Sequence, residues 1–198
     1  MKFNLSEIQE IIEERRTIKP EQFSDRKVHK EIIEKMLNAA KWAPTHRLTQ
    51  PWRFTVFTND GLRKLGELHA NLYKELADED SFSDRKYQTL LHRPQMSSAC
   101  IAIALKRDEQ ERVPFNEELA SVAIAVQNMS LVATAYGIGT YWATGGKVYS
   151  PEMKVALGYD ENDSVLGLLY VGYPEREWPR KTPRKPIEYF TTWVDSED

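Results

Sequence analysis

The sequence predicts a mixed α/β fold, because helix-like and strand-like apolar patterns alternate along its 198 residues. The first helix-like pattern is formed by Leu5, Ile8, Ile11 and Ile12, which share one face at helical spacing. The first strand-like pattern runs from Arg53 to Thr58, where β-branched and aromatic residues alternate with others. A chain of this length is typical of one domain, so we expect a single domain over residues 1–198.

The same two patterns place the other elements. Ser6 and Gln9 fit a capping box at the start of the first helix, which should end near Arg15 and Arg16. Further helices are expected over 28–40, from Asn59 or Asp60 to Leu76, in a short segment up to Pro94, over 115–136, and from Ser150 to Gly158. Strands are expected over 99–105 and 165–173.

Two segments need more burial than one small chain supplies. The latter half of the helix at 115–136 is small and apolar around nearly its whole circumference, as buried helices are. The proline-rich tail predicts an extended arm over 174–198, and its Phe190 and Trp193 need a surface to pack on. The other subunit of a dimer is one surface that could cover both segments.

Composition excludes several classes of protein. The formal net charge of −3 gives no basic surface for nucleic acid. The longest apolar runs, such as Val165 to Val171, are too short to span a bilayer, and the first residues lack the apolar core of a signal peptide. We therefore expect a cytoplasmic protein without a membrane partner. Cys100 is the single cysteine and lies in an apolar run, so it reads as a core residue, and the four histidines show no zinc-binding spacing.

Three separate segments together indicate one ligand site. Arg15-Arg16-Thr17 supplies charge and donors for a phosphate. The segment from Ala43 to Trp52 is a rigid polar turn that leads into a strand, and Gly137 to Gly146 is rich in small residues that let the backbone approach a flat ring. A phosphorylated aromatic cofactor fits this combination, and flavin mononucleotide (FMN) fits it best.

Each segment also has a simpler interpretation. Arg15 and Arg16 at a helix end could only complement the helix dipole, which is worth about 0.3–1 kcal/mol, whereas a charge-assisted bond to phosphate contributes roughly 1.5–3 kcal/mol. We favour the phosphate role for Arg15 and Thr17, since one of two adjacent arginines can point elsewhere. For Gln50 the role of a cofactor contact is favoured, because an amide can both donate to and accept from the edge of a flavin ring. Trp42 is either part of a helix core or a contact of the cofactor.

These motifs, in this order, resemble those of the nitroreductase family of FMN-dependent oxidoreductases. Arg15-Arg16-Thr17 resembles the family's Arg-Arg-Ser, and Ala43-Pro44 to Trp52 resembles its Ala-Pro-Ser to Gln-Pro-Trp turn. Gly137-Ile138-Gly139 to Gly146 and Val171-Gly172-Tyr173-Pro174 with Arg184-Lys185-Pro186 match its closing segments. Leu48 departs from the asparagine of many members, while His46 is similar to a compact subgroup whose turn reads Ala-Pro-Asp-His.

The resemblance implies a mostly antiparallel sheet flanked by helices, and a homodimer with FMN at its interface. It also implies hydride transfer from NAD(P)H through flavin N5 to nitroaromatic, quinone or similar electron-poor acceptors. Backbone N–H groups of Thr144 and Gly145 would approach N5 and O4, and no catalytic acid is assigned. The expected cofactor contacts are Arg15, Arg16, Thr17, Trp42, His46, Gln50, Trp142, Ala143, Thr144, Gly145 and Arg184.

Two other functions stay open on the sequence. An enzyme of the same fold could perform reductive dehalogenation or flavin degradation, but a dedicated enzyme should have a specific lid, and only the short polar stretch from Asp78 to Arg93 offers one. A non-enzymatic protein could store or sense FMN, and it would oxidise NAD(P)H no faster than free flavin does.

Overall fold

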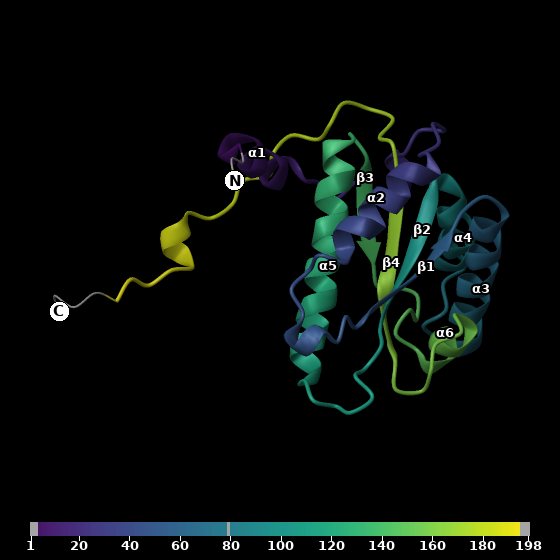
Figure 1. The fold of residues 1–198 in the computed structure, drawn as a ribbon. Helices are drawn as coiled ribbons and strands as arrows, with labels where there is room; N and C mark the ends of the chain where they lie inside the picture. Colours follow the sequence, from purple (N-terminus) through teal and green to yellow (C-terminus); the bar gives the residue numbers. More distant parts are fainter. Residues whose placement is uncertain (1–3, 79, 195–198) are drawn as a thin grey trace.

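A four-stranded antiparallel sheet forms the centre of the computed structural model, which describes residues 4–78 and 80–194. Its strands are β1 (Trp52–Phe57), β2 (Ala99–Leu105), β3 (Gly139–Ala143) and β4 (Ser164–Gly172). They lie in the order β1-β2-β4-β3, and every neighbouring pair is antiparallel (Figure 1). The sheet confirms the mixed class and the antiparallel arrangement that the resemblance implied.

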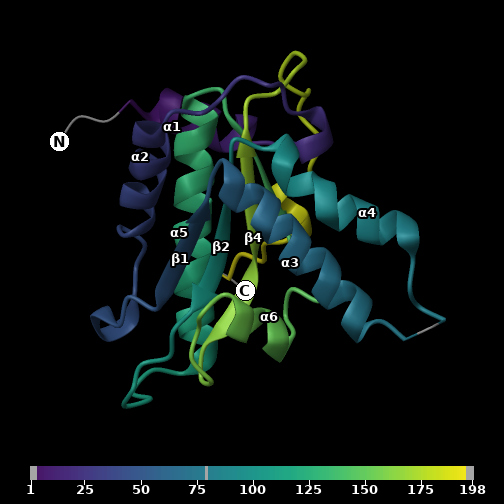
Figure 2. The ribbon, with the colours of Figure 1, turned by 90° about the vertical axis from the view of Figure 1, so that its right-hand side faces the viewer.

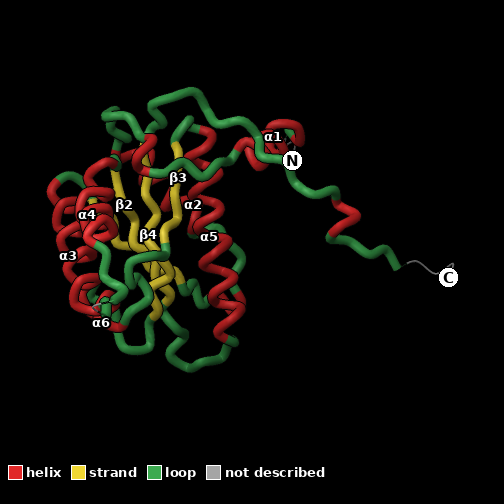
Figure 3. The backbone as a smooth tube through the Cα atoms, turned by 180° about the vertical axis from the view of Figure 1, so that it is seen from behind, coloured by secondary structure: helices red, strands yellow, loops and turns green. Residues whose placement is uncertain are grey.

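Helices cover both faces of this sheet. On one face lie α2 (Lys30–Ala40) and α5 (Phe115–Ala135), and on the other lie α3 (Asp60–Leu76), α4 (Asp84–His92) and α6 (Pro151–Ala156). Figure 2 shows α3 and α4 in front of the strands, and Figure 3 shows the sheet between the two groups of helices. Short 3-10 turns occur at Pro20–Gln22, His46–Leu48, Arg93–Met96 and Ile187–Tyr189.

Burial of the central strands explains their composition. All seven residues of β2 are buried, including Cys100, because helices cover both faces of this strand. On the α5 side, Val122 and Met129 are fully buried against the strands. By length and mean hydropathy alone α5 could cross a membrane, but this packing on the sheet accounts for its apolar composition.

Two local expectations were wrong. The first helix, α1 (Leu5–Glu14), is capped by Asn4, whose side chain accepts from the backbone N–H of Ser6, so Ser6 and Gln9 form no capping box. Asn competes well with Ser as a cap, which makes adjacent candidates hard to separate from sequence. Strand β3 was not expected, because its run of five residues lies within a segment interpreted through its glycines.

The C-terminal segment leaves the sheet after Tyr173 and passes α1. The indole Nε1–H of Trp178 donates to the carbonyl of Glu14 at 2.8 Å, and Lys181 pairs with Glu13 at 2.8 Å. Beyond this contact the chain extends away from the body (Figures 1 and 3). The side chains of Ile187, Tyr189, Phe190 and Trp193 are exposed there.

Candidate functional site

One hollow of about 240 Å³ brings together residues from all parts of the chain. It is lined by Arg15 and Thr17 after α1, by Thr140 and Trp142 of β3, by Leu169 of β4, and by Ala123, Val126, Gln127 and Ser130 of α5. Thr140 and Trp142 share this face because side chains alternate along a strand. Thr17 is joined to the edge of the sheet by a bridge to Thr140, and the N–H of Ile18 donates to the carbonyl of Thr140. The sheet edge therefore fixes the position of the arginine segment.

The guanidinium of Arg15 has no hydrogen-bond or ion-pair partner within the part of the chain that the structure describes. Partial burial lowers the pKa of Arg15, and the positive charges of Arg16 and Arg184 lower it further. Three guanidinium groups thus raise the local positive potential, and no described carboxylate forms a salt bridge with any of them. Such a cluster is suited to an anion.

The neighbouring Arg16 is buried and mostly engaged with backbone. Its Nε donates to the carbonyl of Arg180 at 3.2 Å, and its Nη1 donates to the carbonyls of Glu13 and Arg15. These bonds hold the start of the C-terminal segment against the end of α1. Its Nη2 is buried without an acceptor among the described residues, so one strong donor remains for a ligand.

Trp142 forms one wall of the hollow and depends on a glycine. Its Nε1–H donates to the carbonyl of Leu166 at 2.9 Å, and the indole lies where a side chain of residue 167 would be. A Cβ at Gly167 would lie 2.1 Å from Nε1 of Trp142, and the φ of +143° at Gly167 also favours glycine. The indole is 36% exposed, which leaves a face for contact with a ligand.

Strand β3 ends at Ala143, and the loop after it carries Thr144, Gly145 and Gly146. Ala143 is buried in the core on the α3 side, whereas Thr144 and Gly145 are exposed. Ala143 therefore contributes backbone rather than side chain to any ligand contact. An added Cβ at Gly145 would meet nothing within 4 Å, so space lies next to this backbone.

Below this loop lies the buried side chain of His69 on α3. Its Nε2 lies 3.2 Å from the carbonyl oxygen of Gly145 and 2.9 Å from that of Gly146. Since both partners only accept, Nε2 must carry the proton. Burial is the main cause that lowers the pKa of His69, to about 4, so the ring is neutral at pH 7.

The predicted turn at His46 lies at the other end of α5. Nδ1 of His46 is 2.7 Å from a carboxylate oxygen of Glu117, and the two line a second hollow of about 410 Å³. Arg47, Leu48 and Gln50 all have positive φ, between 46° and 53°, which is strained backbone for non-glycine residues. Trp42 is 80% exposed, so its interpretation as a core residue was wrong.

The structure therefore brings only part of the predicted set together within one chain. Arg15, Thr17 and Trp142 share the first hollow, with Arg16 and Arg184 close by. Trp42, His46 and Gln50 do not line it. Arg184 is exposed and its guanidinium donates to the carbonyl of Thr182.

Sequence reasoning missed Thr140, Gln127, Glu117 and His69. The alternation of β3 would have paired Thr140 with Trp142, had the strand been recognised. His69 follows Leu65 by four residues, so the helical period places it on the buried face of α3. Gln127 and Glu117 could not be found from sequence, because their roles depend on which side of α5 stays open.

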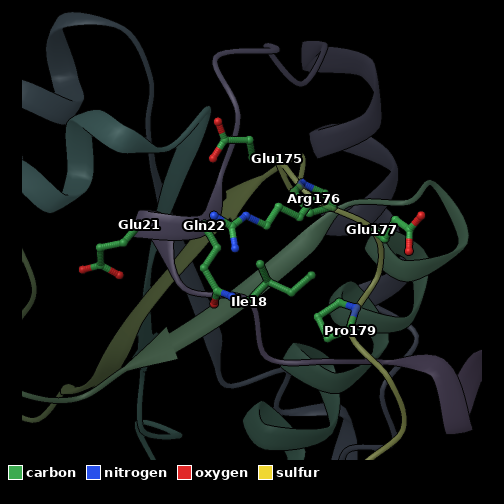
Figure 4. Close-up of a pocket in the computed structure, with 8 residues that line it drawn as sticks. Ile18, Glu21, Gln22, Glu175, Arg176, Glu177 and Pro179 are labelled. Atoms are coloured by element: carbon green, nitrogen blue, oxygen red, sulfur yellow. The ribbon is translucent and has the colours of Figure 1, made fainter.

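A separate cavity of about 270 Å³ lies where the chain leaves β4. Figure 4 shows its lining, with Arg176 and Gln22 on one side and Pro179 near Ile18. Glu21, Glu175 and Glu177 give it mixed charge. No residue of the predicted site lines it, and the described residues contain no group of acidic, histidine or cysteine side chains that could hold a metal.

The fold and the first hollow define an α+β protein with a cationic, partly aromatic ligand site between a sheet edge and its longest helix. The chain belongs to the Nitroreductase family, whose model matches residues 12–173. YfhC of Bacillus subtilis, named as a candidate NAD(P)H nitroreductase, is 30% identical over 183 residues, which cover 92% of this chain and 91% of that protein.

Solved structures share the fold over nearly the whole chain. A nitroreductase-like family protein from Bacillus cereus is 26% identical with a TM-score of 0.81, and the match covers 99% of this chain and 100% of that one. The FMN-dependent nitroreductase NfnB from Mycobacterium smegmatis, solved with NADPH, has a TM-score of 0.75 at 18% identity, with 96% and 99% covered.

A more distant likeness bears on the alternative function. Iodotyrosine deiodinase from Nematostella vectensis is 24% identical over 204 residues, which cover 95% of this chain and 75% of that protein.

Proposed function

We propose that this protein is an FMN-dependent oxidoreductase that takes hydride from NAD(P)H and passes it to nitroaromatic, quinone or similar electron-poor acceptors. The observation that carries the proposal is the guanidinium of Arg15, which has no partner among the described residues and lines the same hollow as Thr17 and Trp142. Family membership and the names of the relatives support the same activity.

The donor set of the hollow fits the phosphate of FMN. Arg15 and the exposed Thr17 hydroxyl are available, and Nη2 of Arg16 is a buried donor without an acceptor among the described residues. An arginine matches phosphate oxygens with two parallel bonds, each charge-assisted. We propose that these three residues hold the phosphate, with Arg184 as an additional cation.

The flavin ring would lie towards Trp142 and the exposed backbone of Thr144 and Gly145. When bound, FMN supplies the ring that takes up and releases hydride. The protein supplies orientation: Trp142 offers an apolar face, and small residues let backbone approach the ring. Fixed backbone dipoles next to the ring would stabilise charge that develops during transfer.

The second hollow explains why a homodimer would complete the site. Gln127 and Ser130 line the first hollow, whereas Glu117 and Ala120 line the second, about 15 Å further along α5. A twofold axis across the exposed face of α5, near Ile124, would exchange the two ends of the helix. The first hollow of one copy would then face His46 and Gln50 of the other.

The first experiment is an absorbance spectrum of the purified protein, followed by anaerobic addition of NADPH or NADH. Bound flavin whose visible bands bleach on addition of nucleotide would support the proposal. Flavin that does not bleach, or NAD(P)H oxidation no faster than with free flavin, would favour storage or sensing. A colourless protein that takes up no added FMN would refute the proposal.

A pair of variants tests the phosphate contact itself. Arg15→Ala should weaken FMN binding at least tenfold, because one charge-assisted bond contributes roughly 1.5–3 kcal/mol. Arg85→Ala on α4 removes the same charge from an exposed position outside the hollow and should leave FMN affinity unchanged. Equal affinities of the two variants would contradict the assignment of Arg15.

The deiodinase likeness makes reductive dehalogenation a second candidate. The expected lid does not support it, since Asp84–His92 is helix α4, which packs on α3 across the sheet from the hollow. Release of iodide from an iodinated phenol by the reduced protein would support dehalogenation. Reduction of a quinone at a higher kcat/KM than that of the iodophenol would support the first proposal.

A further inference from the structure

We infer that His69 is a positioning residue, which locks the glycine loop at Gly145 and Gly146 so that its outward backbone N–H groups face the flavin. The inference rests on the proposed function. It concerns a residue of α3 that does not line the hollow, because α3 and α5 cover opposite faces of the sheet.

The contact between ring and loop is close and specific. The ring is 1% exposed, and its Nε2–H is shared between two consecutive carbonyl oxygens, at 3.2 Å and 2.9 Å. A Cβ at Gly146 would lie 2.6 Å from Nε2 and 2.8 Å from the end of Leu90, and φ at Gly146 is +73°. Gly146 is thus required both by its backbone angle and by the approach of His69.

This contact fixes which way the peptide groups of the loop point. In a trans peptide, the carbonyl and the following N–H point in opposite directions. Because the carbonyls of Gly145 and Gly146 point down to His69, the N–H groups of Gly146 and Lys147 point away from it. Neither N–H has a protein acceptor within the residues that the structure describes.

A neutral histidine suits this role better than a charged group would. A buried cation would need compensation, and the positive charges that face the ring, those of Lys86 and Arg93, would oppose it. The neutral ring provides one donor in a fixed direction, and its buried Nδ1 has no hydrogen-bond partner among the described residues. The loop is therefore held in one orientation before any ligand arrives, which lowers the entropic cost of binding.

The experiment compares three variants of the full-length protein. His69→Leu removes the donor at similar volume, and His69→Gln keeps an amide donor. Tyr73→Phe is the matched control, because Tyr73 lies on the same buried side of α3 and its hydroxyl bonds to Ser81 and Ser83, not to the loop.

The first readout uses protein without FMN and follows tryptic cleavage after Lys147, which is exposed in the loop. We expect His69→Leu to be cleaved about tenfold faster than the wild type, with Tyr73→Phe unchanged. The second readout is the FMN dissociation constant and the position of the visible flavin bands. We expect about tenfold weaker binding and shifted bands in His69→Leu, with both effects largely restored in His69→Gln.

The outcomes separate this inference from the proposed function. If the wild type binds no FMN, the proposed function fails. If the wild type binds FMN and His69→Leu matches it in affinity and spectrum, the positioning role is refuted, whatever the cleavage rate. Should His69→Leu fail to fold, Gly146→Ala disturbs the same contact from the loop side and must show the same two effects for the inference to stand.

Discussion

Acid should destabilise this protein through His69 before most of its carboxylates titrate. The pKa of His69 is lowered to about 4 in the folded state, from an ordinary value near 6.5. As the pH falls below about 6.5, His69 becomes protonated in the unfolded chain but stays neutral in the folded chain. Stability is therefore lost progressively between about pH 6.5 and pH 4 and is fully retained above that range.

The size of the effect follows from the difference in pKa. Each unit corresponds to 1.36 kcal/mol, so the full loss is about 3 kcal/mol, and about 2 kcal/mol has been lost by pH 5. The cause is the buried Nδ1, which would carry the new proton without an acceptor among the described residues. The bonds from Nε2 to the carbonyls of Gly145 and Gly146 favour the protonated ring and offset only part of this cost, so burial still lowers the pKa.

Urea unfolding of the FMN-free protein, followed by tryptophan fluorescence at pH 7, 6 and 5, measures the effect. Protein concentration is held constant, because association would also change apparent stability. His69→Gln cannot titrate, so its unfolding free energy should fall by about 2 kcal/mol less than that of the wild type between pH 7 and pH 5. Parallel pH dependences for wild type and His69→Gln would refute the reasoning.

Four further substitutions test the geometry of the site. Gly145→Val should leave the apo unfolding free energy within about 0.5 kcal/mol but abolish FMN binding in a titration, whereas Gly146→Val should cost more than about 2 kcal/mol in the same urea assay. If the Gly145→Val protein is yellow and fully active, the proposed contact between the Gly145 backbone and the flavin ring is refuted. Gly167→Ala should displace the indole of Trp142 and shift its fluorescence, and an unchanged spectrum would contradict the close contact. Ile124→Arg should give a monomer by light scattering that no longer retains FMN, and a flavin-loaded monomer would exclude the shared site.

The elements that the sequence predicted correctly have a long helical repeat of apolar residues or an uninterrupted apolar run. Helix α3 follows its leucines, and β2 is a continuous apolar run with little other interpretation. Strand β3 was not predicted, because a strand of five residues in a glycine-rich segment shows almost no alternation of apolar and polar residues. Its recognition depends on pairing with β4, which is distant in sequence.

The candidate site divides in the same way. Arg15 and Thr17 were found because adjacent residues of complementary chemistry stand out in a sequence. His69 was not, because one histidine among leucines shows no partner until the chain folds and brings Gly146 to it. The core interpretation of Trp42 was wrong because a tryptophan at a helix end resembles a core residue, and only the packing shows that this one is exposed. Its contact with the cofactor stays a prediction.

Because Trp142 contacts Gly167, we expect substitutions at these two positions to be correlated in evolution. The indole fills the volume that any side chain at 167 would need, so neither position can change size alone. Among related sequences, a larger residue at 167 should accompany a smaller one at 142. The side chain at 167 on β4 would then form the wall of the hollow that the indole forms here. Substrate range in this lineage would shift by exchange of that pair and not by either substitution alone.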